Sequence, residues 1–195
     1  MLIKWLDSGS CRFPVYCTHL LGAGGLVFNT KTGKLLLMQE RWMEKPAWKI
    51  SGGQVDPKEW IEGAAEREVW EETGVKVTTH GILASRELLR FRWNRADIYY
   101  IVLCLTEQEE INIDKSEALK AEWFTIEEVI ADSFEKSMTF NWVAKTLKEI
   151  YLKHHKEERP LYEIIRDEYV ERSVKLHVRN AQSSTSDGIY RFPKI

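Results

Sequence analysis

Apolar residues in the first part of the chain fall into short runs that are typical of strands. His19–Phe28 is mostly apolar and carries glycines that let another backbone approach closely. The turn signal Asn29–Gly33 separates it from a second run, Lys34–Gln39, so the two runs predict a hairpin. Further strands are expected at Trp48–Ile50, Val75–Val77, Ile82–Leu88 and Ile98–Leu105, with one more ending at Trp123-Phe124.

The clearest helix signal begins after the short run at Trp48–Ile50. Asp56, Pro57 and Glu59 stand in the order of an N-cap, a first-turn proline and a capping-box glutamate. Gly74 is a matching stop signal, because glycine readily adopts the left-handed conformation after the last helical turn. These signals predict a helix over Pro57–Thr73.

Two more helices are expected in the second half. Thr125 with Glu128 predicts a capped helix over Thr125–Ala131, and apolar residues recur at a helical period within Phe140–Leu152. The order of strands and helices indicates an α+β fold arranged as an α/β/α sandwich. We divide the chain into a lead-in (1–19), a main domain (20–152) and a C-terminal helix and tail (153–195).

Composition narrows the class of protein. The 195 residues are 44% hydrophobic and 30% charged, which suits one globular core. No apolar run approaches the roughly 20 residues of a membrane span, and no secretory signal is seen. A net charge of -2 disfavours a general nucleic-acid coat protein. Cys11, Cys17 and Cys104 form no metal-like cluster and favour a cytoplasmic location, with nucleus and mitochondrion left open.

An acidic face on the expected helix is the first sign of chemistry. Glu68, Glu71 and Glu72 are spaced i, i+3, i+4, so their side chains share one face. Like charges at this spacing cost about 0.2–0.5 kcal/mol, and the negative helix end adds to that cost. A bound Mg²⁺ or Mn²⁺ would reverse both penalties. The alternative is a solvated acidic face.

The spacing around this face resembles the Nudix box, Gly-x5-Glu-x7-Arg-Glu-U-x-Glu-Glu-x-Gly-U, where U is aliphatic. Every fixed position matches: Gly53, Glu59, Arg67, Glu68, Glu71, Glu72 and Gly74, with Val69 and Val75 at the aliphatic positions. The resemblance implies a Nudix-type α/β/α sandwich with a mixed central sheet and one catalytic loop-helix-loop. The flanking residues, including Trp5, Pro14 and His19, look like the fibroblast-growth-factor-antisense Nudix proteins and the plant ADP-ribose/NADH diphosphatases.

The family resemblance implies a metal-dependent hydrolase that cleaves the pyrophosphate of a nucleoside diphosphate linked to another moiety, releasing a nucleoside monophosphate. The implied metal ligands, for Mg²⁺ or Mn²⁺, are Glu68, Glu71, Glu72 and the carbonyl of Gly52. Two or three such ions would neutralise the phosphates and activate a water. Arg67 is expected to orient a catalytic glutamate, with a surface salt bridge as the alternative.

Two other glutamates are harder to assign. On a straight helix Glu59 and Arg67 would be about 12 Å apart along the axis, so a direct pair requires Glu59 to lie outside the regular helix. A simple capping role is the alternative. Glu117, six residues before Trp123, resembles the family's additional loop carboxylate, which serves as base or extra ligand. Glu109, Glu110 and Asp114 are rivals, and a solvated acidic loop is the alternative.

Substrate recognition is expected from basic and aromatic side chains, because arginine forks suit phosphates and aromatic rings suit a stacked base. The candidates are Arg41, Trp42, Arg86, Arg90 and Trp93, with a solvated basic loop as the alternative for the arginines. The pair His154-His155 is expected on the surface rather than as ligands.

The favoured substrate is ADP-ribose or NADH, a small-molecule nucleotide, on subgroup resemblance alone. A dinucleoside polyphosphate or a capped RNA is the alternative enzyme substrate, and coenzyme A is disfavoured because no additional upstream motif is seen. Other nucleic acid and membranes are not expected as partners. From another class, a non-catalytic nucleotide sensor or an interaction scaffold would need no metal for binding. A homodimer is an expectation from the family.

Overall fold

The computed structural model describes residues 18–91, 95–170, 174–179 and 186–191. Almost all of the expected lead-in 1–19 therefore lies outside the described residues. No helix among the described residues is long and apolar enough to cross a membrane.

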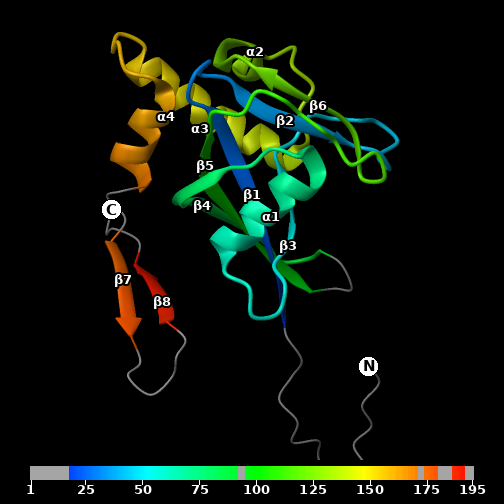
Figure 1. The fold of residues 1–195 in the computed structure, drawn as a ribbon, viewed down its shortest axis with the longest axis vertical. Coiled ribbons are helices and arrows are strands. Elements are labelled where there is room, and N and C mark those ends of the chain that lie inside the picture. The colour runs from blue at the N-terminus through cyan, green and yellow to red at the C-terminus, as the bar shows by residue number, and fades with distance from the viewer. Residues whose placement is uncertain (1–17, 92–94, 171–173, 180–185, 192–195) are drawn as a thin grey trace, which may run out of the picture.

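A six-stranded sheet forms the centre of the molecule (Figure 1). Its order is β4-β5-β1-β2-β6, and β3 pairs with β1 off this path. The β1–β5 pair is parallel and the other pairs are antiparallel, so the sheet is mixed, as expected. The strands are β1 (His19–Asn29), β2 (Leu35–Glu40), β3 (Ser51–Gln54), β4 (Thr78–Leu88), β5 (Ala96–Thr106) and β6 (Ala118–Phe124).

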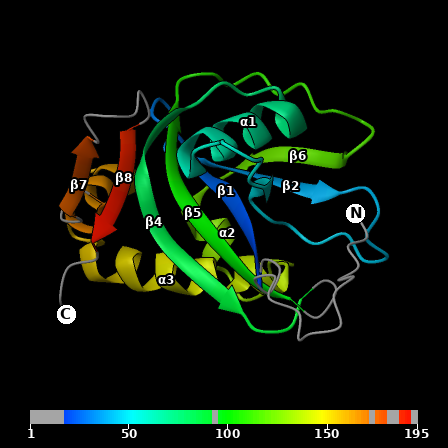
Figure 2. The same cartoon turned by 90° about the horizontal axis from the view of Figure 1, so that it is seen from below.

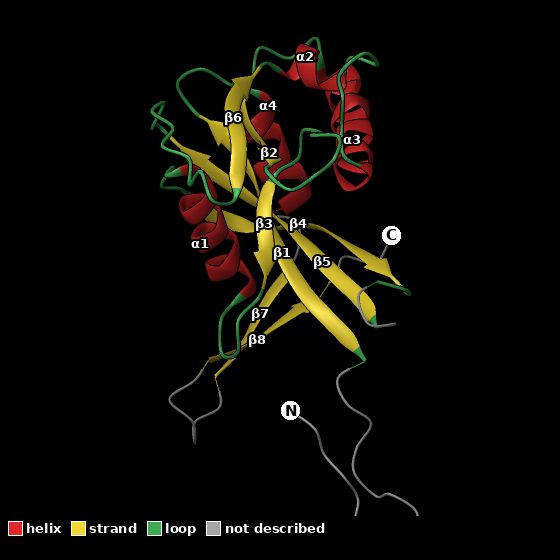
Figure 3. Ribbon diagram, turned by 90° about the vertical axis from the view of Figure 1, so that its right-hand side faces the viewer, coloured by secondary structure: helices red, strands yellow, loops and turns green. Residues whose placement is uncertain are grey.

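Helices cover both faces of this sheet. Figure 3 shows α1 (Ile61–Thr73) on one side and α2 (Ile126–Ile130) with α3 (Met138–His154) on the other, and Figure 2 shows the same layers from below. Each face has its own apolar core: Ala64, Ala65 and Val69 of α1 pack on one, while Phe140 and Leu147 of α3 pack on the other. The α/β/α sandwich is confirmed.

The C-terminal segment packs against the core on the α3 side. The short helix α4 (Leu161–Ile164) runs into a π-helix, η2 (Ile165–Val170), and both contribute buried residues to the cluster that holds Phe28. β7 (Val174–Arg179) and β8 (Ser186–Arg191) form a separate two-stranded sheet (Figure 1). The division at residue 152 stays a prediction.

Several local predictions are confirmed and others are wrong. The hairpin β1–β2 forms, Thr125 and Glu128 make the expected capping box, and Gly74 ends α1 at φ 69°. Val75–Val77 is not a strand, because β4 starts at Thr78. The short strand expected at Trp48–Ile50 begins at Ser51 instead, with Trp48 and Lys49 making only isolated bridges.

The start of α1 is the main local correction. The helix begins at Ile61 rather than at Pro57, its N-cap is Trp60, and no side chain caps it. Lys58 has a positive φ of 69°, which interrupts any helix through this segment. Residues 56–59 instead form a turn in which the Asp56 amide donates to Glu59 Oε2 at 2.9 Å. The contact expected of a capping box is therefore present, but it forms before the helix.

Candidate active site

Arg67 links the acidic residues at the start and on the face of α1. Its Nε and one terminal nitrogen donate to the two carboxylate oxygens of Glu59 at 2.8 and 2.9 Å. The other terminal nitrogen donates to Glu68 Oε1 at 2.8 Å and to Glu71 Oε2 at 2.9 Å. Glu59 can pair with Arg67 because Glu59 lies outside the helix. The sequence predicts a direct pair only under this condition. The Arg67 guanidinium lowers the pKa of Glu59.

Glu72 is a buried carboxylate, with 6% of the residue exposed. The amide of Gly52 donates to its Oε2 at 2.9 Å, and Lys49 Nζ lies 3.9 Å from its Oε1. Lys49 also pairs with Glu40. Burial raises the pKa of Glu72 to about 7, although Lys49 and the Gly52 amide act in the opposite direction. Without a bound cation, about half of the Glu72 side chains are therefore protonated at pH 7.

The carboxylate of Glu68 lies directly against Gly53 of β3. A Cβ atom at residue 53 would come within 2.5 Å of Glu68 Oε1, so only glycine leaves room for this carboxylate. Burial raises the pKa of Glu68, Arg67 opposes that shift, and the charges of Glu71 and Glu117 add to it. Glu117 therefore lies within charge range of Glu68. Glu117 belongs to an exposed loop. Its backbone carbonyl accepts a hydrogen bond from the Arg41 amide at 2.9 Å.

These donors fit a hard divalent cation. Glu72 offers a buried carboxylate and Glu68 a half-buried one. Burial disfavours the charged form of each, and a cation would stabilise both charged forms. Gly52, whose carbonyl was the expected backbone ligand, is on the same strand β3. The side chain of Glu71 is 45% exposed and forms an ion pair with Arg67. Glu68, Glu71 and Glu72 do not form a group with oxygens all within 4.8 Å of one another.

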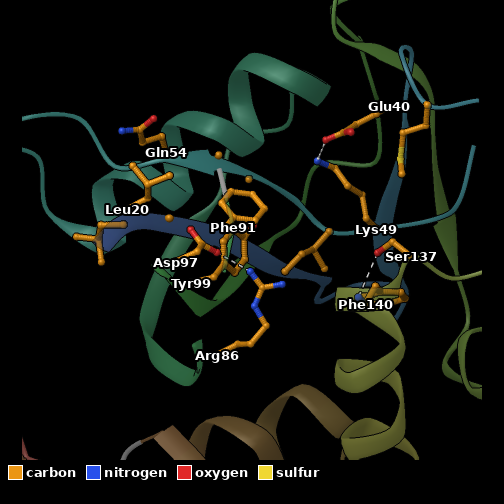
Figure 4. Close-up of a pocket in the computed structure, with 16 residues that line it drawn as sticks. Leu20, Glu40, Lys49, Gln54, Arg86, Phe91, Asp97, Tyr99, Ser137 and Phe140 are labelled. Atoms are coloured by element: carbon orange, nitrogen blue, oxygen red, sulfur yellow. Dashed lines mark hydrogen bonds and ion pairs between the residues drawn. The ribbon is translucent and has the colours of Figure 1, made fainter. Parts of the chain in front are cut away.

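A cavity of about 380 Å³ lies between the sheet and the first turn of α3 (Figure 4). Lys49, Gly52 and Gly53 line both this cavity and the carboxylate site, so the two are continuous. The remaining wall is partly apolar. It includes Leu20, Leu21, Met43, Ile50, Phe91, Tyr99 and Phe140, together with the polar residues Glu40, Gln54, Arg86, Asp97 and Ser137.

Tyr99 is a central residue of this wall that sequence reasoning missed. Its ring fills the space that side chains at Gly22 and Gly24 would need, and its hydroxyl lies against Gly24 and Gly52. Burial, and next the charge of Glu72, raise the pKa of Tyr99. The glycines of β1 were the available signal. The sequence predicts that they make room for a backbone, which β3 supplies, but they also make room for this ring from the parallel strand β5.

Arg86 is the one predicted substrate-binding residue that lines the cavity among those the structure describes. It pairs with the buried Asp97 at 2.6 Å, and its guanidinium lies 5.5 Å from the centre of the Tyr99 ring (Figure 4). Sequence reasoning also missed Asp97 and Lys49. Both are ordinary charged residues within strand-like runs, with no spacing motif to mark them.

The other substrate candidates lie elsewhere. Arg41 donates to the carbonyl of Lys115 at 2.6 Å and lies 5.8 Å from the Trp42 ring, which is 82% exposed. Arg90 is exposed and is not among the cavity-lining residues. Trp93 lies outside the described residues. Of the candidates that the structure describes, Arg41, Trp42 and Arg90 therefore do not line the cavity.

Comparison with known proteins identifies relatives of this chain. The NUDIX domain family matches residues 18–145. "Nucleoside diphosphate-linked moiety X motif 6" of Mus musculus is 38% identical over 128 residues, which are 65% of this chain and 41% of that protein. "Nudix hydrolase 7" of Arabidopsis thaliana is 31% identical over 140 residues, covering 70% of this chain and 50% of that protein. The chain spans about half the length of the curated relatives it matches.

A solved structure shares the fold at low sequence identity. The NUDIX domain of Shewanella oneidensis NrtR, determined in complex with ADP ribose, superposes with a TM-score of 0.55. The two chains are 16% identical, and the match covers 69% of this chain and 89% of the other. At this identity the likeness concerns the fold alone.

Proposed function

The chain belongs to the Nudix family, and on that premise we propose that it hydrolyses the pyrophosphate bond of a nucleoside diphosphate linked to another moiety. The observation that carries this proposal is the continuity between the α1 carboxylates and an adjacent cavity. Gly52 donates its amide to Glu72 and also lines the cavity. A phosphate of a ligand bound in the cavity would therefore come close to the carboxylates.

The protein residues in this mechanism mainly position and neutralise. Glu68 and Glu72, with Glu71 and the Gly52 carbonyl as further ligands, would hold Mg²⁺ or Mn²⁺. When bound, the cation neutralises phosphate oxygens and lowers the pKa of a water. Arg67 fixes the Glu68 side chain through the hydrogen bond at 2.8 Å, so its orientation is set before substrate arrives.

Water attacks one phosphorus in line, one P–O bond of the anhydride breaks, and two phosphate monoesters leave. A carboxylate must accept the proton of the attacking water. We assign this role to Glu117, because its loop is exposed and its charge acts on Glu68 from outside the helix. An exposed carboxylate outside the helix leaves Glu68 and Glu72 available to hold the cation.

The favoured substrates are ADP-ribose and NADH, on the resemblance of the chain to the plant diphosphatase subgroup. The matched plant Nudix hydrolase and mouse nucleoside-diphosphate-linked protein support the broader class of a nucleoside diphosphate linked to another moiety. The cavity also suits one half of such a molecule: Tyr99 and Phe140 offer apolar contact, and Arg86 offers a hydrogen-bond fork. A cytoplasmic location and a homodimer stay predictions.

A product assay tests the proposal. ADP-ribose, NADH, FAD, coenzyme A, a diadenosine polyphosphate and capped RNA are each incubated with Mg²⁺, Mn²⁺ or chelator. The proteins are wild type, Glu72→Gln and the control Glu66→Gln, which changes an exposed glutamate of the same helix. We expect metal-dependent release of a nucleoside monophosphate that only Glu72→Gln abolishes. Nucleotide binding that survives chelator, with no turnover on any substrate, would instead indicate the non-catalytic sensor.

A further inference from the structure

A second cluster of potential metal ligands lies where α3 meets the C-terminal segment. His154 is the last residue of α3, Glu157 follows in the next turn, and Glu168 lies in η2. Each offers one ligand atom, and these atoms lie within 4.8 Å of one another. His154 is only 8% exposed, so the expectation that it lies on the surface is wrong. The neighbouring His155 is exposed, as expected.

The two ring nitrogens of His154 have different surroundings. Nδ1 lies 2.5 Å from Glu157 Oε1, which is a hydrogen bond. Nε2 is buried, and it has no hydrogen-bond partner in the part of the chain that the structure describes. It faces Glu168 Oε2 at 3.7 Å, too far for a hydrogen bond. A buried polar nitrogen without a hydrogen bond is uncommon and requires an explanation.

We propose that His154 and Glu168 bind a zinc ion, with Glu157 holding the histidine in place. Zinc bonds to histidine nitrogen and carboxylate oxygen are about 2.0–2.2 Å long, so two tetrahedral ligands lie about 3.4 Å apart. The observed 3.7 Å between Nε2 and Oε2 needs only a small adjustment. Metal-bound histidines almost always donate their other ring N–H to a carboxylate, a backbone carbonyl or water. Glu157 already accepts from Nδ1 in this way.

The chemistry of the cluster selects the ion. An imidazole nitrogen combined with a carboxylate suits Zn²⁺, whereas Mg²⁺ prefers an all-oxygen shell. The side chain of Glu157 is 40% exposed and that of Glu168 is 23% exposed, so the site reaches solvent although His154 is buried. Water can therefore complete the four-coordinate shell, and the ion has a path from solution.

The site is separate from the α1 carboxylates. His154 ends α3, and α3 covers the face of the sheet opposite α1 (Figure 3). Glu168 lies in a π-helix, a rare conformation that is frequently found at functional sites. Because Ile165 and Val170 of η2 are buried in the α3-side core, a zinc ion would join the end of α3 to the C-terminal segment. Zinc binding would therefore add to the stability of the folded state.

A zinc titration of the full chain tests the site. Zn²⁺ is distributed between the protein and a chromophoric chelator at neutral pH, with Mg²⁺ in large excess to occupy the α1 carboxylates. The proteins are wild type, Glu168→Gln, Glu157→Gln and the matched control Glu158→Gln, an exposed neighbour outside the cluster. Circular dichroism checks that each variant is folded.

We expect wild type and Glu158→Gln to bind one zinc ion with equal affinity, and zinc to raise the melting temperature of both. Glu168→Gln should bind zinc at least about 10-fold more weakly than wild type. Glu157→Gln should also bind zinc at least about 10-fold more weakly, because it no longer holds the His154 ring in place. Equal affinity in all four proteins, or no zinc bound by wild type, would overturn the proposal and leave an ion-pair cluster. Glu72→Gln should keep this zinc site, so the outcome does not depend on the hydrolase proposal.

Discussion

Arg67 donates two hydrogen bonds to the carboxylate of Glu59, which lies eight positions earlier in the chain. Nε donates to Oε1 at 2.8 Å, and a terminal nitrogen donates to Oε2 at 2.9 Å. The pair joins the turn before α1 to the middle of the helix. The same guanidinium also holds Glu68 and Glu71. One side chain therefore sets the positions of three carboxylates, and this suggests that its planar shape matters as well as its charge.

Arg67→Lys should keep the charge and lose the geometry, because a lysine ammonium cannot make the two-pronged contact. We expect kcat to fall by about 10- to 100-fold through misplaced carboxylates, with a smaller change in KM. Steady-state kinetics on the substrate found in the product assay measure this. Arg159→Lys, an arginine paired with Asp167 away from α1, is the control. Equal kcat in the two variants would show that charge alone suffices at position 67.

Gly53→Ala should damage activity more than stability. The new Cβ meets the far end of the Glu68 side chain at 2.5 Å, so the carboxylate shifts with little strain on the backbone, but it leaves its position at the site. We expect the Mg²⁺ concentration for half-maximal activity to rise, on the order of 10-fold.

Gly63→Ala is the matched control for Gly53→Ala. Residue 63 lies within α1, and a Cβ there has only an ordinary contact at 3.9 Å. Alanine in this helix should raise the free energy of unfolding by about 0.5–1 kcal/mol and leave the metal requirement unchanged. Chemical denaturation and metal titration of both variants separate the two effects. A Gly53→Ala protein with a wild-type Mg²⁺ requirement would contradict the proposed role of Glu68.

Metal-free protein should become less stable as the pH rises through the range in which Glu72 titrates. The folded-state pKa is about 7 and the ordinary value is 4.5, so between these values the folded protein keeps a proton that the unfolded chain has lost. Raising the pH removes that proton at a cost to the folded state, on the order of 3 kcal/mol in total.

Urea denaturation in chelator, from about pH 5 to about pH 8, measures this effect. The comparison is with Glu72→Gln, which cannot titrate. We expect the stability of wild type relative to Glu72→Gln to decrease with increasing pH, and added Mg²⁺ to offset the loss at the upper end. A difference that stays constant across this range would mean that Glu72 is already ionised at low pH.

Arg86→Met should affect both substrate binding and stability. It leaves the buried Asp97 without the partner that it holds at 2.6 Å, and we expect a loss on the order of 3 kcal/mol. The double variant Arg86→Met/Asp97→Leu removes both charges and should recover much of that stability. If Arg86 binds substrate, KM stays raised several-fold in both variants. A double variant with wild-type KM would restrict Arg86 to a structural role.

The sequence by itself determined the features that depend on neighbours along the chain. Helical spacing brings Glu68 and Glu72 to one side of α1. Gly74 ends the helix because glycine adopts the left-handed conformation there without a steric penalty. The Nudix box identified the family because its spacing follows from one helix and the loops on either side. The helix spacing also allowed a conditional prediction, that Glu59 can meet Arg67 only from outside the helix.

Tertiary structure decided where α1 begins and which residues share the cavity. Glu59 accepts hydrogen bonds from both the Asp56 amide and Arg67, and the helix begins only after this turn, at Ile61. Tyr99 reaches the carboxylate site because β5 pairs with β1 in parallel, with Gly22 opposite Tyr99. Hydrophobic periodicity predicts that a segment is a strand, but it carries no information about the neighbouring strand or the register. Those depend on how the whole sheet packs.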